Sequence, residues 1–237
     1  MKIIRCKDYH DLSRRAVQVI LTRIEEEPDL LMCAATGNTP KSTYKMLGAT
    51  AKTRNVECSR VKVIQLDEWV SLPADHEASC QHQLEKELIK PLDINELCLI
   101  NGDNPEMHNE LLKVNDYLKT YGPIDLCILG MGTNGHLGFN EPSDQLTEEC
   151  HITHLSRTSR EHTMIEGVSP TPSQGITLGM RQILDSRQIL LLVSGGSKRE
   201  IFAELLAADE DSSLPASFLK NHPNVICLVD QEAYPKS

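Results

Sequence analysis

Acidic residues and one histidine stand where they could move protons. Asp67 and Glu68 directly follow a short apolar run, and His136 shares a tight glycine-rich loop with Glu141. A carboxylate at the end of a buried strand can have a perturbed pKa, and a histidine beside a carboxylate is a ready acid/base group. These residues predict proton-transfer chemistry. Each also has a structural alternative, because an acid there could cap the next segment and a loop histidine could simply bond to the backbone.

Two further loops could bind an anion. The first loop, Thr36–Pro40, lies between an apolar run and a helical pattern, and Pro40 stands near the start of that pattern. The second loop, Ser194–Lys198, places Lys198 at the start of another helical pattern. Free N–H groups at a helix N-terminus attract anions, whereas the helix dipole disfavours a lysine there unless an anion is also bound. A plain strand-to-helix turn capped by Thr39 is the structural alternative for the first loop. Its candidate binding residues are Thr36, Gly37, Asn38 and Thr39.

Two sequence patterns are similar to a dinucleotide-binding motif and to a pair of metal ligands, but the residues around them argue against both functions. Gly130–Gly135 matches G-x-G-x-x-G, but Gly138 and Pro142 follow where a dinucleotide-binding loop should open a helix. His151 and His154 could suggest a metal, yet no third ligand has suitable spacing, and an ordinary strand fits better. We therefore expect neither a cofactor nor a metal.

The elements that must position these residues follow an alternating pattern. Continuous apolar runs are typical of strands buried on both faces of a parallel sheet, and helical patterns lie between them. The runs are Leu30–Ala35, Val61–Leu66, Ile124–Leu129, Ile189–Val193 and Val225–Val229, and the clearest helices span Asp11–Glu26, Pro40–Thr53 and Lys198–Ala207. This order predicts an α/β fold, a three-layer Rossmann-like sandwich with a mostly parallel central sheet, in one domain over residues 1–237. Ligands of such sheets bind at the carboxyl ends of the strands, so the four loops should form one site.

Composition narrows the class of partner and compartment. The net charge of −10 argues against a nucleic-acid partner and means that an anionic ligand must be held by a few placed cations and backbone N–H groups. No apolar stretch reaches membrane-spanning length, and the N-terminus lacks the apolar core of a signal peptide. The eight cysteines are scattered without a C-x-x-C pair. These features favour a cytoplasmic protein with no membrane partner.

Taken in order along the chain, these loops resemble the glucosamine-6-phosphate deaminase/isomerase family. The matching segments are Ala35–Pro40, the Leu-Asp-Glu-Trp motif at 66–69, Ile124–Gly130, the Asn-Gly-His-Leu-Gly-Phe-Asn-Glu-Pro motif at 134–142, Gly175–Gly179, Ser194–Lys198 and Pro215–Leu219. Asp-Leu-Cys-Ile-Leu-Gly at 125–130 and Cys-His-Ile-x-x-Leu at 150–155 resemble the galactosamine branch most. The resemblance covers nearly the whole chain and implies a metal-independent reaction.

What the resemblance implies for single residues is a set of expected roles. His136 would open the sugar ring with support from Glu141, and Asp67 would move a proton from C2 to C1. Glu68 would sit beside Asp67 and contact the substrate. The phosphate would be held by the Thr36–Thr39 loop together with Arg160 and Lys198, which would answer the problem set by the negative net charge.

One departure concerns Asn134, because many glucosamine-type members carry an aspartate there and an anionic neighbour stabilises imidazolium better than an amide does. The galactosamine-like members also have asparagine, so the expected reaction is galactosamine 6-phosphate to tagatose 6-phosphate. Glucosamine 6-phosphate to fructose 6-phosphate is the alternative. The small-molecule sugar phosphate is the expected partner, an oligomer is possible, and the short segment after Val229 argues against allosteric control.

Two other functions compete. A 6-phosphogluconolactonase of similar fold should show Asp-Glu-Arg at 67–69 and Gly-His-x-Ala-Ser-Leu-Phe-Pro after Asn134, and this chain shows neither. A sugar-phosphate-sensing regulator would need a DNA-binding helix-turn-helix, and the chain begins almost at its first expected strand. Both readings are weaker than the deaminase.

Overall fold

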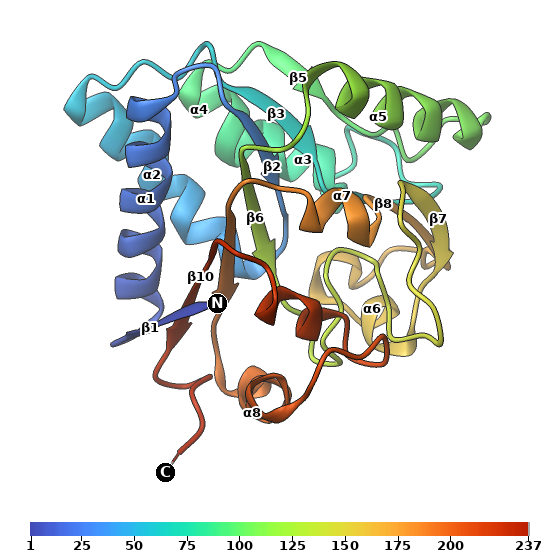
Figure 1. The fold of residues 1–237 in the computed structure, drawn as a ribbon. Helices are drawn as coiled ribbons and strands as arrows, with labels where there is room; N and C mark the ends of the chain where they lie inside the picture. The colour runs from blue at the N-terminus through green and yellow to red at the C-terminus, as the bar shows by residue number, and fades with distance from the viewer. Residues whose placement is uncertain (237) are drawn as a thin grey trace.

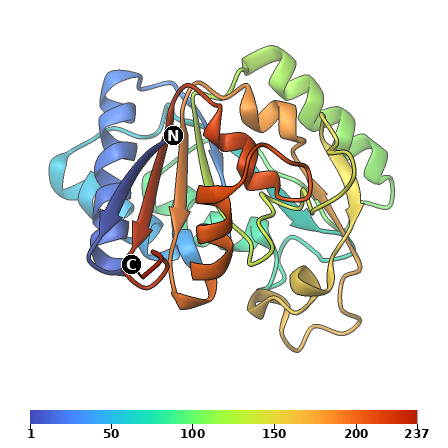
Figure 2. The ribbon, with the colours of Figure 1, turned by 60° about the horizontal axis from the view of Figure 1, so that its bottom comes forward.

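A seven-stranded parallel sheet forms the centre of the protein in the computed structural model, which describes residues 1–236. The strand order is β1-β10-β9-β6-β2-β3-β5, and every adjacent pair is parallel. Figure 2 shows β1, β10 and β9 side by side. The strands are β1 (Lys2–Cys6), β2 (Leu31–Ala34), β3 (Lys62–Gln65), β5 (Glu96–Cys98), β6 (Leu126–Gly130), β9 (Ile189–Val193) and β10 (Val225–Asp230).

Helices cover both faces of this sheet, as the apolar strands require. Along β2, Met32 and Ala34 pack into the cluster that contains α1 and α2, whereas Leu31 and Cys33 pack into the cluster that contains α5, α7 and α8. Successive side chains of a strand point to opposite faces, so a strand buried on both sides must be apolar throughout. Figure 1 shows α1 and α2 on one side and α5 and α7 on the other. These helices are α1 (Tyr9–Glu26), α2 (Asn38–Arg54), α5 (Met107–Tyr121), α7 (Met180–Leu184) and α8 (Arg199–Ala207). The predicted three-layer α/β architecture is confirmed, and the single domain stays a prediction.

A second, three-stranded antiparallel sheet lies beside the first and is absent from the sequence-based prediction. Its order is β4 (Asp67–Trp69), β8 (Gln174–Thr177) and β7 (His151–His154). The chain leaves the large sheet at Gln65 and enters the small sheet at Asp67. Because only Leu66 separates the two strands, the apolar run Val61–Leu66 does not indicate that the chain changes from one sheet to the other. The strand expected at His151–His154 is present. Asp67 therefore stands at the junction of the two sheets.

The helix boundaries correct two expectations. Helix α1 begins at Tyr9 because the Asp8 side chain accepts a hydrogen bond from the backbone N–H of Asp11 at 2.8 Å. Helix α2 begins at Asn38 with Gly37 as its N-cap, so Pro40 is the third helical residue and not the first, and Thr39 is no cap. Proline is tolerated there because first-turn N–H groups have no partner within the helix.

The remaining segments are short. A 3₁₀ turn, η3 (Gly196–Lys198), precedes α8, so Lys198 stands just before that helix. Within the described residues, no helix is both long and apolar enough to span a membrane. The other short helices are α3 (Cys80–Leu84), η1 (Glu85–Ile89), α4 (Lys90–Leu92), α6 (Arg157–Arg160), η2 (Thr163–Ile165) and η4 (Pro215–Lys220).

Candidate active site

A cavity of about 600 Å³ opens where β2, β6 and β9 end and where β4 begins. Cavities of this size hold metabolites, and the carboxyl edge of an open parallel sheet is where such ligands bind. All four loops singled out in the sequence contribute to its wall. Its polar lining includes Thr36, Gly37, Asn38, Thr39, Asp67, Thr133, His136, Thr158, Ser159, Glu161, His162, Ser194, Ser197 and Lys198.

The Asp67 carboxylate faces this cavity, and its oxygen atoms are available to a ligand. Its backbone is fixed by pairing with Thr177 across the small sheet, while its side-chain oxygens have no hydrogen-bond partner among residues 1–236. Burial, and then the neighbouring charge of Glu68, raise the pKa of Asp67 to about 7. A carboxylate held in this way can accept a proton from a bound ligand near neutral pH.

Glu68, in contrast, does not reach the cavity, and the expectation that it contacts substrate is not met. Because side chains alternate along β4, the Glu68 carboxylate points away from the Asp67 side. It is fully buried and accepts hydrogen bonds from five donors. Burial raises its pKa, although these hydrogen bonds oppose the rise. The donors are Gln65 Nε2 at 3.0 Å, Trp69 N at 2.8 Å, Ser79 Oγ at 2.8 Å, Cys80 N at 3.0 Å and Gln81 N at 2.8 Å.

His136 and Glu141 form an acid/base pair on the loop after β6. Nδ1 of the imidazole lies 3.3 Å from Oε2 of Glu141, in a contact too poorly aligned to count as a hydrogen bond. The Asn134 amide does not touch the ring. Its Nδ2 donates to the same Glu141 oxygen at 2.9 Å, and its Oδ1 accepts the backbone N–H of His136 at 3.3 Å. Asn134 therefore bonds the backbone of His136 directly, and its link to the imidazole runs through Glu141.

The Glu141 carboxylate also joins this loop to the turn at α6. Its other oxygen, Oε1, accepts the backbone N–H of Ser156 at 3.2 Å and the Ser159 hydroxyl. Burial would raise the pKa of Glu141, but the contacts with His136, Ser159 and Asn134 outweigh it and lower the pKa to about 2. Glu141 is thus held ionised beside the imidazole.

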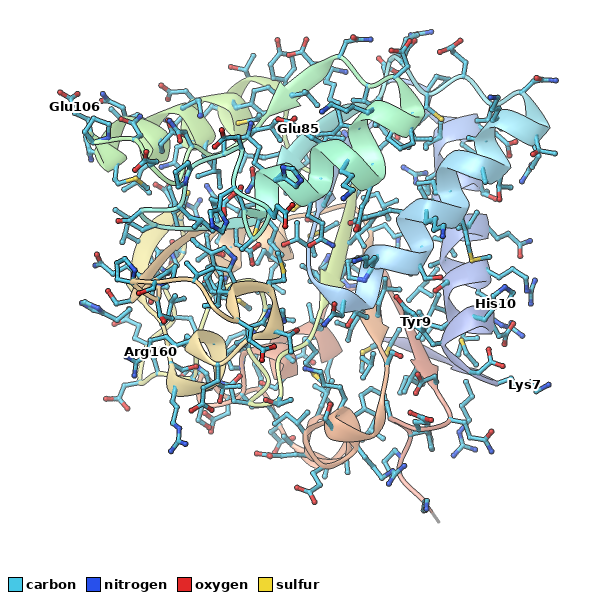
Figure 3. The ribbon with its side chains drawn as sticks, turned by 180° about the vertical axis from the view of Figure 1, so that it is seen from behind. Lys7, Tyr9, His10, Glu85, Glu106 and Arg160 are labelled. Carbon is cyan, nitrogen blue, oxygen red and sulfur yellow. The ribbon has the colours of Figure 1, made fainter. Side chains whose placement is uncertain are left out.

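The N-terminus of α2 forms one end of the cavity. Gly37 has a φ of +95°, which favours glycine, and the Gln83 side chain bonds both its N–H and its carbonyl at 3.0 Å. The hydroxyl of Tyr9, labelled in Figure 3, lies 2.7 Å from the carbonyl oxygen of Asn38 and accepts the Ser42 N–H at 3.1 Å. These contacts fix the first turn of α2, whose N–H groups can then face an anion.

Lys198 lines the same cavity from the loop after β9. It forms no ion pair among residues 1–236, and burial lowers the pKa of its ammonium group to about 8. Asp230, at the end of β10, positions this loop by accepting the Ser194 hydroxyl and the Gly195 N–H. An unpaired, partly buried cation beside a helix N-terminus can neutralise an anionic ligand.

Arg160 does not lie in the cavity that Lys198 lines. It stands at the end of α6, where Figure 3 labels it, its side chain is exposed, and it does not line the cavity. Neighbouring helical positions point about 100° apart, so burying Ser159 against Glu141 turns Arg160 toward solvent. The structure therefore does not pair Arg160 with Lys198, contrary to the sequence-based expectation.

Several residues in or next to the site were not singled out from the sequence, among them Trp69, His162 and Asp230. Trp69, the only tryptophan, is 3% exposed, with its ring centroid 4.6 Å from that of Phe139 and 6.2 Å from that of His162. The position of Trp69 in the Leu-Asp-Glu-Trp motif, directly after the two carboxylates, could have indicated that it belongs to the site. His162 gave no such indication, because it follows no apolar run, and Asp230 could have been found as an acid ending the last run. Among residues 1–236, no three His, Cys, Asp or Glu side chains cluster as metal ligands would.

Comparison with known proteins shows which family this chain belongs to. Residues 8–227 match the model of glucosamine-6-phosphate isomerases/6-phosphogluconolactonase. The chain belongs to this family. It is 37% identical over 225 residues to the proposed deaminase AgaI of Escherichia coli (strain K12), covering 94% of this chain and 90% of that protein. It is 36% identical over 237 residues to a glucosamine-6-phosphate deaminase of Shouchella clausii (strain KSM-K16), covering 98% and 96%.

Solved structures of the family agree on the fold. A monomeric glucosamine-6-phosphate deaminase of the NagB superfamily superposes with a TM-score of 0.94 and 32% identity over 98% of both chains. A 6-phosphogluconolactonase from Shewanella baltica OS155 superposes with a TM-score of 0.77 and 19% identity over 97% of both chains, a likeness of fold alone. The resemblance read from the loops is confirmed.

Proposed function

We propose that this protein is an amino-sugar-6-phosphate deaminase that converts a 2-amino-2-deoxyhexose 6-phosphate and water into a ketose 6-phosphate and ammonia. The observation that carries the proposal is the Asp67 carboxylate, which faces the cavity, has no hydrogen-bond partner within residues 1–236 and has a pKa of about 7. Isomerisation of an aldose needs a base of this kind beside C2. The family also contains lactonases, so the choice within it rests on this site and on the relatives named as deaminases.

Ring opening comes first and falls to His136. Its imidazole lines the cavity and is backed by the ionised Glu141, so it can exchange a proton with the ring oxygen or the anomeric hydroxyl. The open chain then presents an aldehyde at C1 and the amine at C2. Glu141, held by Asn134 and Ser159, stabilises the charged imidazole that forms during this exchange.

Proton transfer from C2 to C1 falls to Asp67. Removal of the C2 proton moves its electron pair into a C1–C2 double bond and pushes the C1 carbonyl π pair onto O1. O1 takes up the proton that the C2 ammonium group releases, and the product is an enolamine. Return of the proton at C1 gives an iminium at C2, and water adds there as ammonia leaves, so that C2 becomes the ketone. Asp67 begins and ends this step as a carboxylate, so the residue is regenerated.

The phosphate is assigned to the end of the cavity formed by the first turn of α2 and by Lys198. Backbone N–H groups of a 17-residue helix suit a dianion there, as does the Lys198 ammonium, which has no carboxylate partner in the described part of the chain. Arg160 is left out of this assignment because it is exposed and does not line the cavity.

Galactosamine 6-phosphate is the proposed preferred substrate, on the likeness of the 125–130 and 150–155 motifs and of Asn134 to the galactosamine branch. The two epimers differ only at the C4 hydroxyl, which is remote from C1 and C2. A buried group left without that hydroxyl costs about 1–3 kcal/mol, or roughly 5- to 150-fold in kcat/KM. Glucosamine 6-phosphate is the alternative substrate.

The test is ammonia release from both hexosamine 6-phosphates, with hydrolysis of 6-phosphogluconolactone measured in parallel. We expect ammonia from both epimers, faster from the galactosamine one, and no lactone hydrolysis. Preference for glucosamine 6-phosphate would reverse the assignment of the epimer and leave the reaction standing. Lactone hydrolysis without ammonia release would overturn the proposed function.

A further inference from the structure

Gln65 is a fully buried polar side chain at the point where the chain passes from the large sheet to the small one. Its Nε2 donates to the backbone carbonyl of Asp67 at 2.8 Å and to Oε2 of Glu68 at 3.0 Å. Its Oε1 accepts the backbone N–H of Ile100, two residues beyond β5, at 2.9 Å. The amide therefore joins the ends of β3 and β5 to the first two residues of β4, and it takes no direct part in the proposed reaction.

The strand that carries the base has a neighbouring strand on one side only. In the described part of the chain, β4 is an edge strand of the small sheet and pairs with β8 alone. On that side the backbone N–H of Leu178 donates to the carbonyl of Leu66 at 2.9 Å. Successive carbonyls of a strand point to opposite edges, so the carbonyl of Asp67 points to the open edge. There its partner is the Gln65 amide, which stands where a further strand would donate its backbone N–H.

We propose that Gln65 is a positioning residue for the proton transfer between C2 and C1, acting in place of a neighbouring strand at the open edge of β4. The inference rests on the proposed function and on Asp67 as its base. By holding the carbonyl of Asp67, the amide fixes the backbone from which the carboxylate is directed into the cavity. By donating to Glu68, it also holds the second carboxyl on the opposite face of the strand. A displacement of about 1 Å at a reacting group can cost about 10²-fold in rate, so this support matters to turnover.

Two substitutions remove the support to different degrees. Gln65→Met keeps the length of the side chain and removes all three hydrogen bonds. Gln65→Asn is the milder variant, because an amide one methylene shorter cannot reach Ile100 and Asp67 together. Gln182→Met is the matched control, since Gln182 also joins two elements, donating to the Asn115 side chain at 2.7 Å, but does not line the cavity. Melting temperatures show which variants are folded at the assay temperature.

We expect Gln65→Met to lower kcat on the order of 10- to 100-fold and Gln65→Asn to lower it less. The probe of an intact site is glucitol 6-phosphate, an open-chain phosphate that cannot be isomerised, and calorimetry measures its binding. Its affinity should stay within about threefold of the wild type, with the same number of sites per chain. The isotope effect on kcat with substrate deuterated at C2 should be at least as large as in the wild type, because cleavage of the C2–H bond is the slowed step. Gln182→Met should keep kcat within about twofold of the wild type.

The acid limb of kcat/KM should also move to lower pH in Gln65→Met. Loss of a donor favours the protonated form of Glu68, and a neutral Glu68 no longer raises the pKa of Asp67. A less constrained Asp67 also gains water, which weakens burial, the larger cause of its raised pKa. The other ionisable groups around Asp67 and in its cavity are unchanged by the substitution. They include Cys33, Tyr44, Cys80, His136 and Lys198.

Unchanged kcat in folded Gln65→Met overturns the role of Gln65. An equal fall in kcat and in the number of glucitol 6-phosphate sites overturns it too, because the loss would then be one of folded protein. An isotope effect smaller than in the wild type means that another step was slowed, with the same consequence. If Gln65→Met does not fold, Gln65→Asn is judged by these measurements.

The failure of the proposed function has a different signature, which is the absence of ammonia release from the wild type. Carbon NMR of labelled aspartate carboxyls, with Asp67→Asn for assignment, does not depend on turnover. It should show a lower pKa of Asp67 in Gln65→Met than in the wild type. An unchanged titration of Asp67 would overturn the role of Gln65 whether or not the protein is a deaminase.

Discussion

Asp67 and Glu68 are adjacent carboxylates with opposite surroundings, and this contrast is the main chemical feature of the site. The five donors around Glu68 fix its side chain inside the protein, whereas the side-chain oxygens of Asp67 face the cavity. Alternation along β4 separates the two side chains although their backbone atoms are neighbours. One carboxylate anchors the strand, and the other remains available for chemistry.

Replacing Asp67 by Asn tests the base directly. The variant keeps the shape of the side chain but cannot accept the C2 proton, so kcat should fall about 10²- to 10⁴-fold. Binding of glucitol 6-phosphate should stay within a few-fold of the wild type, because the phosphate contacts are elsewhere. Steady-state ammonia release and calorimetry measure the two quantities. Retention of more than about a tenth of the wild-type kcat would exclude Asp67 as the base.

The pH dependence of kcat/KM should report the same carboxylate. A base works when ionised, and the pKa of Asp67 is raised to about 7, so activity should fall as the pH drops through that value. Glu68→Gln removes the second cause of the rise and should move this acid limb to lower pH. A melting curve shows whether the variant is folded. If a folded variant kept its acid limb at the wild-type pH, the neighbouring charge would have no influence on the base.

At the scale of elements, a close approach between the loop after β6 and the small sheet shapes the cavity. Gly138 has a φ of +57°, and an added methyl group would lie 2.6 Å from the Thr177 hydroxyl oxygen and 3.4 Å from Oδ2 of Asp67. The backbone of this loop therefore touches the strand pair that positions the base. Only glycine meets both the dihedral angle and the crowding.

Gly138→Ala should lower both the melting temperature and kcat, because the loop must retreat from Thr177 and Asp67. Gly167→Ala is the matched control, since Gly167 also has a positive φ, of +82°, but nothing lies within 4 Å of an added methyl group. Both variants share a backbone strain of about 1–3 kcal/mol, and only the first adds the clash. Equal effects of the two substitutions on kcat would mean that the close approach is unimportant.

Glu141 joins the loop to α6, and its pKa of about 2 predicts how stability depends on pH. A carboxyl whose pKa is depressed by folding stabilises the native state above its unfolded value, near 4.3, and loses that contribution as the pH falls toward 2. Glu141→Gln should therefore destabilise the protein at neutral pH, on the order of 2–3 kcal/mol. The difference from the wild type should shrink between about pH 5 and pH 2. Urea unfolding at several pH values measures it, and a difference independent of pH would refute the linkage.

At the scale of the whole molecule, the eight cysteines are all buried and unpaired. Burial raises the pKa of Cys6, Cys58 and Cys98 to about 11 and that of Cys150 and Cys227 to about 12, so reactive thiolate is scarce. A thiol reagent should label the native protein very slowly and all eight thiols in denaturant. Rapid labelling of even one thiol in the native state would contradict this packing.

The five inner strands of the large sheet could be predicted from sequence because each lies in a largely apolar run. The edge strands β1 and β5 carry the exposed residues Lys2, Arg5 and Glu96 and form no such run. The small sheet could not, since β4 continues the chain directly from β3 and its pairing with β8 joins residues more than a hundred positions apart. A similar separation in sequence hid His162, whose ring lies beside Gly37 at the N-terminus of α2.

Asp67, His136 and Lys198 line the cavity because each follows the end of a strand, and their roles stay predictions. Arg160, whose role came from the resemblance alone, is exposed in this structure.

The position of Trp69 gives the protein a built-in optical probe. As the only tryptophan, buried in the cavity wall beside Phe139 and near His162, it is the sole source of indole emission, and that emission originates at the site. A sugar phosphate that displaces water from the cavity changes the polarity around the ring, and a protonated imidazole nearby quenches it. Fluorescence excited at the red edge of indole absorption therefore follows occupancy and local protonation without any label.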